Sequence, residues 1–461
     1  MKINKLIVLV SLFGLTLNSN AQLNPEIKYR RSSLSMIMIE TDKLPNKEAV
    51  MSSWNNYPFP DKYNKHNIID KSININSIKL TDKDLFDAGF LRDSIKGLKV
   101  ALAESAYNSM LGNAVTKSNA KPIRFLNNEK TLAFVLPTEK QEFQIKIEKL
   151  IKERKLANQM VASWYNKSKD GKFDMNLISE RGFYNASELE ANIAKGQIKG
   201  TASLADAGEE LIKNTFLTFT KLDFYENEPV ARLISETAKL KVQKDLAGKP
   251  QMIIDAAMAA IDKAYELGKE GYSLWSKTWL YQLDWNDTVA NEFYTNLWSN
   301  PQAFENSDIF KLKLVGTQYN QSLVTFKLGE KRTQEQIIDL ALVRNVDKSF
   351  STLQKENDVF KPMVPVLSVN PITAQIGLKE SLKGGEKFEV LELTTNSKTG
   401  LTEYIKVGTV KVDKKLIWDN RYNAGDKQEN IQLDKEGKPI TATVFKGSKK
   451  VGVGMLLKQI K

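Results

Sequence analysis

The chain has 461 residues, with 67 lysines and arginines against 55 acidic residues, a single histidine and no cysteine. The length allows two or three domains, and 41% apolar residues is ordinary for a folded protein and excludes wholesale disorder. Without cysteine there can be no disulfide, zinc–thiolate site, iron–sulfur cluster or cysteine nucleophile. One histidine, His66, excludes mechanisms that need two imidazoles. We therefore expect no cofactor and no metal site.

Residues 1–21 have the pattern of a secretory signal peptide. Lys2 and Lys5 precede an apolar run over residues 6–17, and small residues, Ser19 and Ala21, stand just before the expected cleavage point. The run is too short to span a bilayer, which takes about 20 helical residues. The sequence thus predicts export to the periplasm or cell surface of a Gram-negative bacterium, with no transmembrane span.

The basic excess persists after the leader is removed, because that segment carries only two lysines. An excess of this sign favours anionic partners, and we expect envelope proteins or an anionic glycan and no nucleic acid. Lysines alternate with acidic residues along most of the chain, so solubility is the alternative explanation of the charge. The sequence leaves the oligomeric state open.

Residues 22–80 are expected to form an extended N-terminal segment with one buried strand. In residues 34–40 the apolar side chains of Leu34, Met36 and Met38 alternate with those of Ile37 and Ile39. Apolar side chains on both faces predict a strand that is covered on both sides. The aromatic stretch 54–60 is expected to pack on the protein's own core.

Residues 81–360 are expected to form a helix-rich mixed α/β domain. Thr81 and Asp84 have the spacing of a capping box at the start of a helix. Apolar periodicity predicts further helices over 142–165, from 251 through Trp279, and over 333–357. Residues 215–225 alternate as in a strand. The pattern is typical of mixed helix and sheet.

Prolines at 362, 365 and 371 predict a linker over 361–371, followed by a small basic β domain over 372–461. Short strand patterns separated by glycine turns favour an antiparallel barrel or sandwich. In the strand over 404–412 the apolar phase slips at Gly408, which predicts a β-bulge there. The predicted fold class is α+β, a helix-rich body followed by this domain.

Aromatic side chains concentrate in residues 272–298 and are the candidate ligand-binding residues. They are Tyr272, Trp275, Trp279, Trp285 and Trp298. Stacked rings with nearby polar groups such as Asn286 suit a sugar-binding groove. The alternative is that the first three, at helical spacing, complete the apolar stripe of a core helix.

Other motifs point to ordinary structure. Residues 166–174 resemble the first half of a calcium-binding loop, but Leu177 stands where a bidentate glutamate is needed, so a turn is expected. The carboxylates Asp206 and Glu210, and the stripe of Asp262, Glu266 and Glu270, have lysines nearby and are expected to be self-paired. Ser94 and Thr288 lie in short sequences that resemble acceptors of bacterial O-glycosylation.

Several stretches together resemble a known group of proteins. They are 204–216 (LADAGEELIKNTF), 376–392 (IGLKESLKGGEKFEVLE), Val407-Gly408 and 417–422 (IWDNRY). They resemble uncharacterised secreted cell-envelope proteins of Bacteroidota-type bacteria. The resemblance implies a compartment, the periplasm or cell surface, and carries no catalytic residue.

These patterns lead to a functional hypothesis. We expect a non-enzymatic, secreted cell-envelope protein that acts as a binding or structural and assembly module, with no catalytic residue assigned. One alternative is a carbohydrate-binding protein or glycoside hydrolase that uses the aromatic cluster. The other is an accessory of outer-membrane assembly or secretion.

Overall fold

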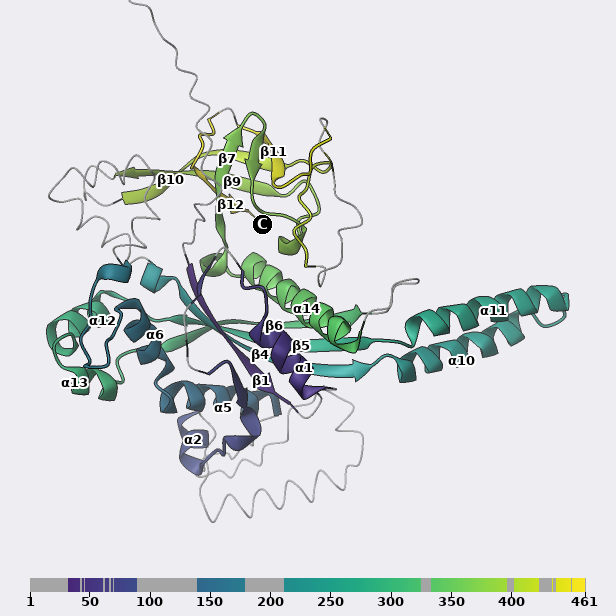
Figure 1. The fold of residues 1–461 in the computed structure, drawn as a ribbon, viewed down its shortest axis with the longest axis horizontal. Coiled ribbons are helices and arrows are strands. Elements are labelled where there is room, and N and C mark those ends of the chain that lie inside the picture. Colours follow the sequence, from purple (N-terminus) through teal and green to yellow (C-terminus); the bar gives the residue numbers. More distant parts are fainter. Residues whose placement is uncertain are drawn as a thin grey trace, which may run out of the picture.

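The structure is a computed structural model. It describes residues 32–88, apart from 42–43, 45, 61–62, 66–67 and 69, and residues 139–178, 211–324, 333–395, 402–422, 433, 437–448 and 450–460. The expected leader, His66, Ser94 and the pair Asp206 and Glu210 lie outside these ranges. The described residues form a mixed sheet with helices on both faces, a projecting helical hairpin and a separate closed barrel (Figure 1).

The larger sheet has the strand order β2-β1-β4-β5-β6, and β3 pairs with β1 beyond β2. Strand β1 runs parallel to β2, β3 and β4, whereas β4, β5 and β6 are antiparallel neighbours. The bounds of its strands are β1 Ser32–Glu40, β2 Tyr63–Lys65, β3 Ser72–Asn74, β4 Thr215–Glu226, β5 Tyr272–Leu283 and β6 Leu312–Val324.

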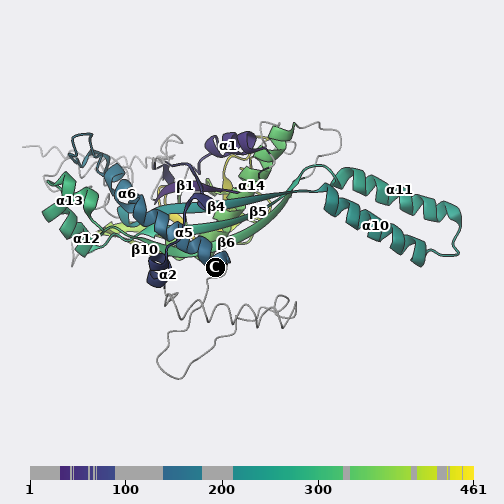
Figure 2. The same ribbon diagram turned by 90° about the horizontal axis from the view of Figure 1, so that it is seen from below.

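The described helices lie on both faces of this sheet and at its ends (Figure 2). Their bounds are α1 Lys47–Asn55, α2 Asp82–Asp87, α5 Glu139–Glu153, α6 Leu156–Trp164, α10 Glu228–Asp245, α11 Gln251–Gly268, α12 Asp287–Glu292, α13 Pro301–Asn306 and α14 Gln334–Glu356. A π-helical turn over Phe293–Leu297 joins α12 to the segment before α13.

The predicted double burial of the first strand is confirmed. Leu34 and Met38 of β1 lie in the core that faces α14, and Ile37 and Ile39 lie in the core that faces α5 and α6. All four side chains are at most 1% exposed. A strand with helices on both faces has no solvent side, so both of its faces are apolar.

The aromatic stretch 54–60 packs on the protein's own core, as expected. Trp54 lies in the last turn of α1, and its indole nitrogen donates a hydrogen bond to the carbonyl of Lys71 at 2.9 Å. Tyr57 is buried beside it, with ring centroids 6.4 Å apart. Helix α1 itself was not anticipated.

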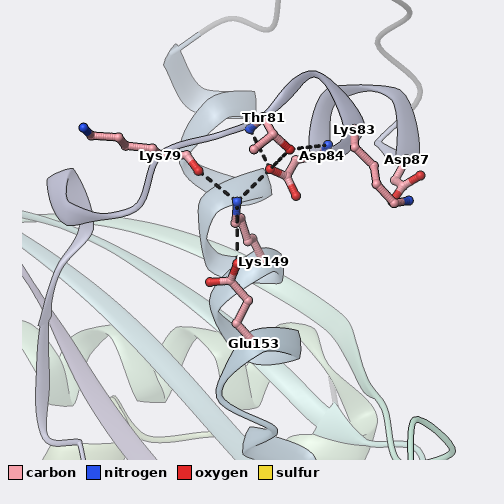
Figure 3. Close-up of polar contacts among 7 residues, drawn as sticks. All are labelled: Lys79, Thr81, Lys83, Asp84, Asp87, Lys149 and Glu153. Carbon is pink, nitrogen blue, oxygen red and sulfur yellow. Dashed lines mark hydrogen bonds and ion pairs between the residues drawn. The ribbon is translucent and has the colours of Figure 1, made fainter.

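The capping box predicted at Thr81 is present and is drawn in Figure 3. The Asp84 carboxylate accepts hydrogen bonds from the amide and hydroxyl of Thr81 at 2.6 Å, and the Asp84 amide donates to the Thr81 hydroxyl at 3.3 Å. Lys149 of α5 reaches the same carboxylate at 2.8 Å. One aspartate therefore starts α2 and fixes it to α5.

The helix predicted over 142–165 is divided in two. Lys155, between α5 and α6, has a left-handed backbone conformation with a φ of 50°. This conformation cannot continue an α-helix, so the chain turns before α6 begins. Both helices still direct apolar side chains such as Ile147 and Met160 into one core against the sheet.

The prediction of one helix from 251 through Trp279 is wrong in its second half. Helix α11 ends at Gly268, Gly271 has a φ of 96°, and residues 272–283 are the strand β5. The aromatic residues of this segment suit a strand, and their spacing matches a helical stripe only by coincidence. Helix α11 pairs instead with α10, and Figure 1 shows this hairpin projecting away from the sheet.

The C-terminal part is a closed barrel with the strand order β10-β11-β8-β7-β12-β9, which confirms the predicted α+β class and small β domain. Its strands are β7 Met363–Val369, β8 Ile372–Ala374, β9 Lys387–Thr395, β10 Thr402–Val412, β11 Thr443–Gly447 and β12 Leu456–Gln459. The predicted bulge is present, because the β9–β10 register shifts between Lys406 and Gly408. A side chain at Gly408 would lie 2.6 Å from the Ser448 hydroxyl.

The stretch 361–371, expected to be a linker, contains β7 instead. Pro365 lies opposite Leu456 of β12, and the β7–β8 register shifts between Val366 and Ser368. Proline is tolerated at the end of a ladder, where its missing N–H is not needed, and the ladder between β7 and β8 begins only at Val366. Pro365 therefore belongs to the first strand of the barrel, whereas Pro362 precedes that strand and Pro371 lies in the turn between β7 and β8.

Candidate functional site

The five aromatic residues predicted to bind a ligand are not brought together. Tyr272 lies in the core below α14, Trp279 in the core below α5, and Trp285 and Trp298 in a third cluster around Phe293. Trp279 is 1% and Trp285 5% exposed, and the indole nitrogen of each has no hydrogen-bond partner among the described residues. One open groove lined by all five rings is thus not formed.

Trp275 is different from the other four, because its side chain is 51% exposed. The residues before and after it, Leu274 and Ser276, face α14, where Asn345 donates to the carbonyl of Leu274 at 3.1 Å and pairs with the Ser276 hydroxyl. Because side chains alternate along a strand, Trp275 points to the opposite face of the sheet. On that face α5 covers Trp279, whose ring is stacked on Phe143.

Two further aromatic residues share this face with Trp275. Tyr225 of β4 contacts the indole edge to face, with ring centroids 5.9 Å apart. Tyr319 of β6 is 53% exposed and is the cross-strand neighbour of Lys277 of β5, on the same face of the sheet. Strands β4, β5 and β6 thus each contribute one exposed ring, and we call these three residues with Lys277 the aromatic sheet face.

Charged and polar groups border the three rings. The ammonium group of Lys277 lies 5.0 Å from the centroid of Tyr319 and 4.3 Å from that of Trp279, within the range of cation–π attraction. Asp223 and Gln321 are the cross-strand neighbours of Trp275. One oxygen of Asp223 pairs with Lys221 at 3.0 Å, and the other is buried and accepts no hydrogen bond from the described residues.

This arrangement suits binding rather than covalent chemistry. Exposed rings can stack on the apolar C–H face of a pyranose, and the carboxylate, amide and ammonium groups beside them can bond its hydroxyls. The sequence identified only Trp275. Tyr225 and Tyr319 lie beside it because β4 and β6 pair with β5. These residues are far from Trp275 in the chain, so no local sequence pattern could predict the contact.

A second cluster of titratable groups lies where the barrel meets α14. Asp347 of α14 accepts a hydrogen bond from the hydroxyl of Tyr57 at 2.6 Å and lies 3.4 Å from the ammonium group of Lys379. Burial raises the pKa of Asp347, although Lys379 and Tyr57 act in the opposite direction. Burial likewise raises the pKa of Tyr57.

Glu380 of the barrel side is also buried, and its carboxylate accepts hydrogen bonds from the amide of Gly377 at 2.7 Å and from Asn420 at 2.9 Å. Glu380, Asp347 and Lys379 line a cavity of about 20 Å³. Such a cavity has room for roughly one water molecule and none for a substrate. The ion pair between Asp347 and Lys379 therefore joins the body to the barrel, and Glu380 is held by residues of the barrel part.

The remaining sequence motifs are structural. The loop over 166–174 is closed by its own contacts, with Asn166 donating to Asp174 at 3.0 Å. In the hairpin, Glu266 pairs with Lys269 at 2.8 Å as predicted, whereas Asp262 pairs with Lys239 of α10 and not with a lysine of its own helix. Thr288 is exposed in the first turn of α12. Within the described ranges, three or more potential metal ligands do not come together.

A scan against protein-family models and a search of curated proteins gave no match to this chain. Among the described residues, no helix is both long and apolar enough to cross a membrane.

Proposed function

We propose that this protein is a non-enzymatic, exported cell-envelope protein that binds a sugar polymer on its aromatic sheet face. The observation that carries the proposal is the exposure of three rings on one side of adjacent strands: Trp275, Tyr319 and Tyr225, which is 40% exposed. Sugar rings stack on such surfaces because both partners remove apolar area from water.

The barrel has a supporting role in this proposal. Residues 372–461 carry 17 lysines and arginines against 11 acidic residues, so this part holds much of the basic excess. Its charge would draw an anionic polymer toward the molecule by long-range attraction that salt weakens. The rings would supply the contacts that depend on sugar geometry.

The test is calorimetric titration of the purified full chain with alginate, an anionic polysaccharide, and with dextran, a neutral one. We expect alginate to bind in a salt-sensitive way. The substitution Trp275→Ala should weaken binding by about tenfold, as removal of a central aromatic anchor commonly does. Ile405→Ala, at an exposed apolar residue of the barrel, is the matched control and should leave binding unchanged.

Two results would overturn the proposal. One is the absence of binding to either polymer at low ionic strength. The other is the release of new reducing ends from the polymer, which would make the protein a hydrolase. Binding that Trp275→Ala leaves intact but salt abolishes would move the site from the sheet to the barrel.

A further inference from the structure

The hairpin of α10 and α11 carries an apolar surface that neither core uses. None of the 18 residues of α11 is buried, and Ser235 is the one buried residue of α10. Leu233 and Ile234 are 65% and 64% exposed. A group of apolar side chains on one side of a helix usually marks a surface that packs against another element. The hairpin therefore presents side chains that favour burial.

The contact line between the two helices divides each of them into two sides. On α10 this line follows Ala231, Ser235 and Ala238, and Gly268 of α11 lies against Ala231. One side of the line is charged on both helices, where Lys239 of α10 pairs with Asp262 of α11 and Tyr265 donates to Glu228 at 2.9 Å.

The opposite side of the contact line is mainly apolar on both helices, and it also carries Lys241 and Lys244 of α10 and Lys263 of α11. Because an α-helix turns about 100° per residue, the side chains rotated away from the charged pairs lie together on one face of the hairpin. We call this surface the apolar hairpin face. It consists of Val230, Ile234 and Thr237 of α10 and of Ile253, Ala256, Ala260 and Ala264 of α11, with Leu233 and Leu240 of α10 and Met252 of α11 at its outer edges.

The two ends of the hairpin carry opposite charge. At the tip, residues 239–250 contain four lysines and one aspartate. At the base, Glu226, Glu228, Glu266 and Glu270 outnumber Arg232 and Lys269. The charges of two such hairpins are therefore complementary when the hairpins lie antiparallel, with the basic tip of one beside the acidic base of the other.

We propose that the apolar hairpin face binds a second copy of this chain, with the two hairpins antiparallel in a four-helix bundle. A two-fold axis near Thr237 places Leu240 of one copy opposite Ile234 of the other, so the interface is isologous. It brings the basic tip of each copy to the acidic base of its partner. The alanines of α11 meet one another and allow the helices to approach closely.

The size of the face fits a weak dimer. Eighteen helical residues extend about 27 Å, and two adjacent helices are about 20 Å wide, so the interface would bury roughly 1,000 Å² in total. This is close to the lower limit for a specific interface. We therefore expect dimerisation that depends on concentration, in the range of about micromolar dissociation constants.

The absence of cysteine allows a direct test in the full chain, because one introduced cysteine is unique. Thr237→Cys lies near the proposed axis and should give a covalent dimer with a short bis-maleimide cross-linker. Gln243→Cys, on the charged side, is the matched control and should stay monomeric. Lys249→Cys at the tip should also stay monomeric, and its cross-linking would show a parallel arrangement and overturn the proposal.

Light scattering across a concentration series provides the second measurement. Ile234→Glu should weaken dimerisation by about tenfold or more, because it buries a charge in the interface. Glu236→Gln on the charged side should leave the mass unchanged. Both residues are exposed, so neither substitution threatens the fold.

A lipid surface is the competing occupant, since Lys241 and Lys263 lie on the apolar side and suit anionic headgroups. The same variants are therefore sedimented with vesicles of phosphatidylglycerol. A chain that stays monomeric at all concentrations, or that binds vesicles through Ile234 without forming dimers, would falsify the proposal. Sugar binding through Trp275 is measured separately, so its failure leaves this result interpretable.

Discussion

Helices α14 and α11 have similar apolar patterns and opposite environments. Fourteen of the 23 residues of α14 are buried, because the helix lies between the sheet, α1 and the barrel, as Figure 1 shows. None of the 18 residues of α11 is buried. An apolar stripe thus predicts that one face of a helix favours burial, but it does not predict which element packs against that face. For α11, one side is covered by α10 and a second side is open.

The difference extends to polar contacts. On α14, Asp347 is enclosed between Tyr57 and the barrel residue Lys379. On the hairpin, Asp262 and Lys239 pair at the surface in contact with water. Polar groups that are removed from water depend on their partners far more than exposed ones, so the two regions should respond very differently to substitution.

The largest expected difference is between two leucine-to-alanine substitutions. Leu353→Ala on α14 should lower the free energy of unfolding by about 2–5 kcal/mol, because Leu353 is 0% exposed and its loss leaves a cavity. Leu233→Ala on α10 should change it by no more than about 0.5 kcal/mol. Urea unfolding at protein concentrations that keep the chain monomeric measures both. Equal losses would mean that the hairpin face is covered.

An intermediate effect is expected at the junction between α14 and the barrel. Asp347→Ala should cost about 2–3 kcal/mol, because it leaves the buried Tyr57 hydroxyl and the half-buried Lys379 without this acceptor. Asp347→Asn keeps an oxygen for Tyr57 and should cost less. If the two variants unfold alike, the hydrogen bond from Tyr57 contributes nothing to the junction.

The smallest effect concerns the carboxylate that joins α2 to α5. Burial acts to raise the pKa of Asp84, but hydrogen bonds from Lys149 and Thr81 prevail and lower it to about 2. A lowered pKa means that ionised Asp84 stabilises the fold above its unfolded pKa of about 3.9 and that this contribution is lost as the pH falls toward the folded value.

Asp84→Ala should therefore cost about 1 kcal/mol at pH 7, a figure reduced for solvent screening, and the difference from the natural chain should shrink as the pH falls below about 4. Urea unfolding at neutral and acidic pH measures this convergence. Asp262→Ala in the hairpin is the control for an exposed ion pair and should have little effect at either pH. A difference for Asp84→Ala that does not vary with pH would contradict the ion-pair explanation.

Features that depend on near neighbours in the chain were predictable. The double burial of β1 follows from apolar residues at both alternations, and the start of α2 follows from the spacing of Thr81 and Asp84. The bulge at Gly408 follows from a slip in the apolar phase of one strand. Each of these signals is contained within a few residues.

The site could not be predicted in the same way. Trp275 was singled out with four other rings, yet its contacts are with Tyr225 and the residues that β4 and β6 place beside it. In the predicted helix, Trp279 would lie one turn from Trp275. In the structure both residues belong to β5 and point to the same face of the sheet, but α5 covers Trp279. Strand register and coverage by a distant helix decide which ring is exposed.

The amino-acid sequence by itself determined the α+β class, the doubly buried first strand, α14 and the bulge, because periodicity and capping act locally along the chain. Only the tertiary structure decided that β7 occupies the proline-rich stretch, that three strands bring their rings to one face, and that α10 covers one side of α11 and leaves the other open. Those outcomes depend on which segments, far apart in the chain, pack against each other. Whether a side chain is buried depends on both of the surfaces that come into contact, and the local sequence of one segment describes only one of them.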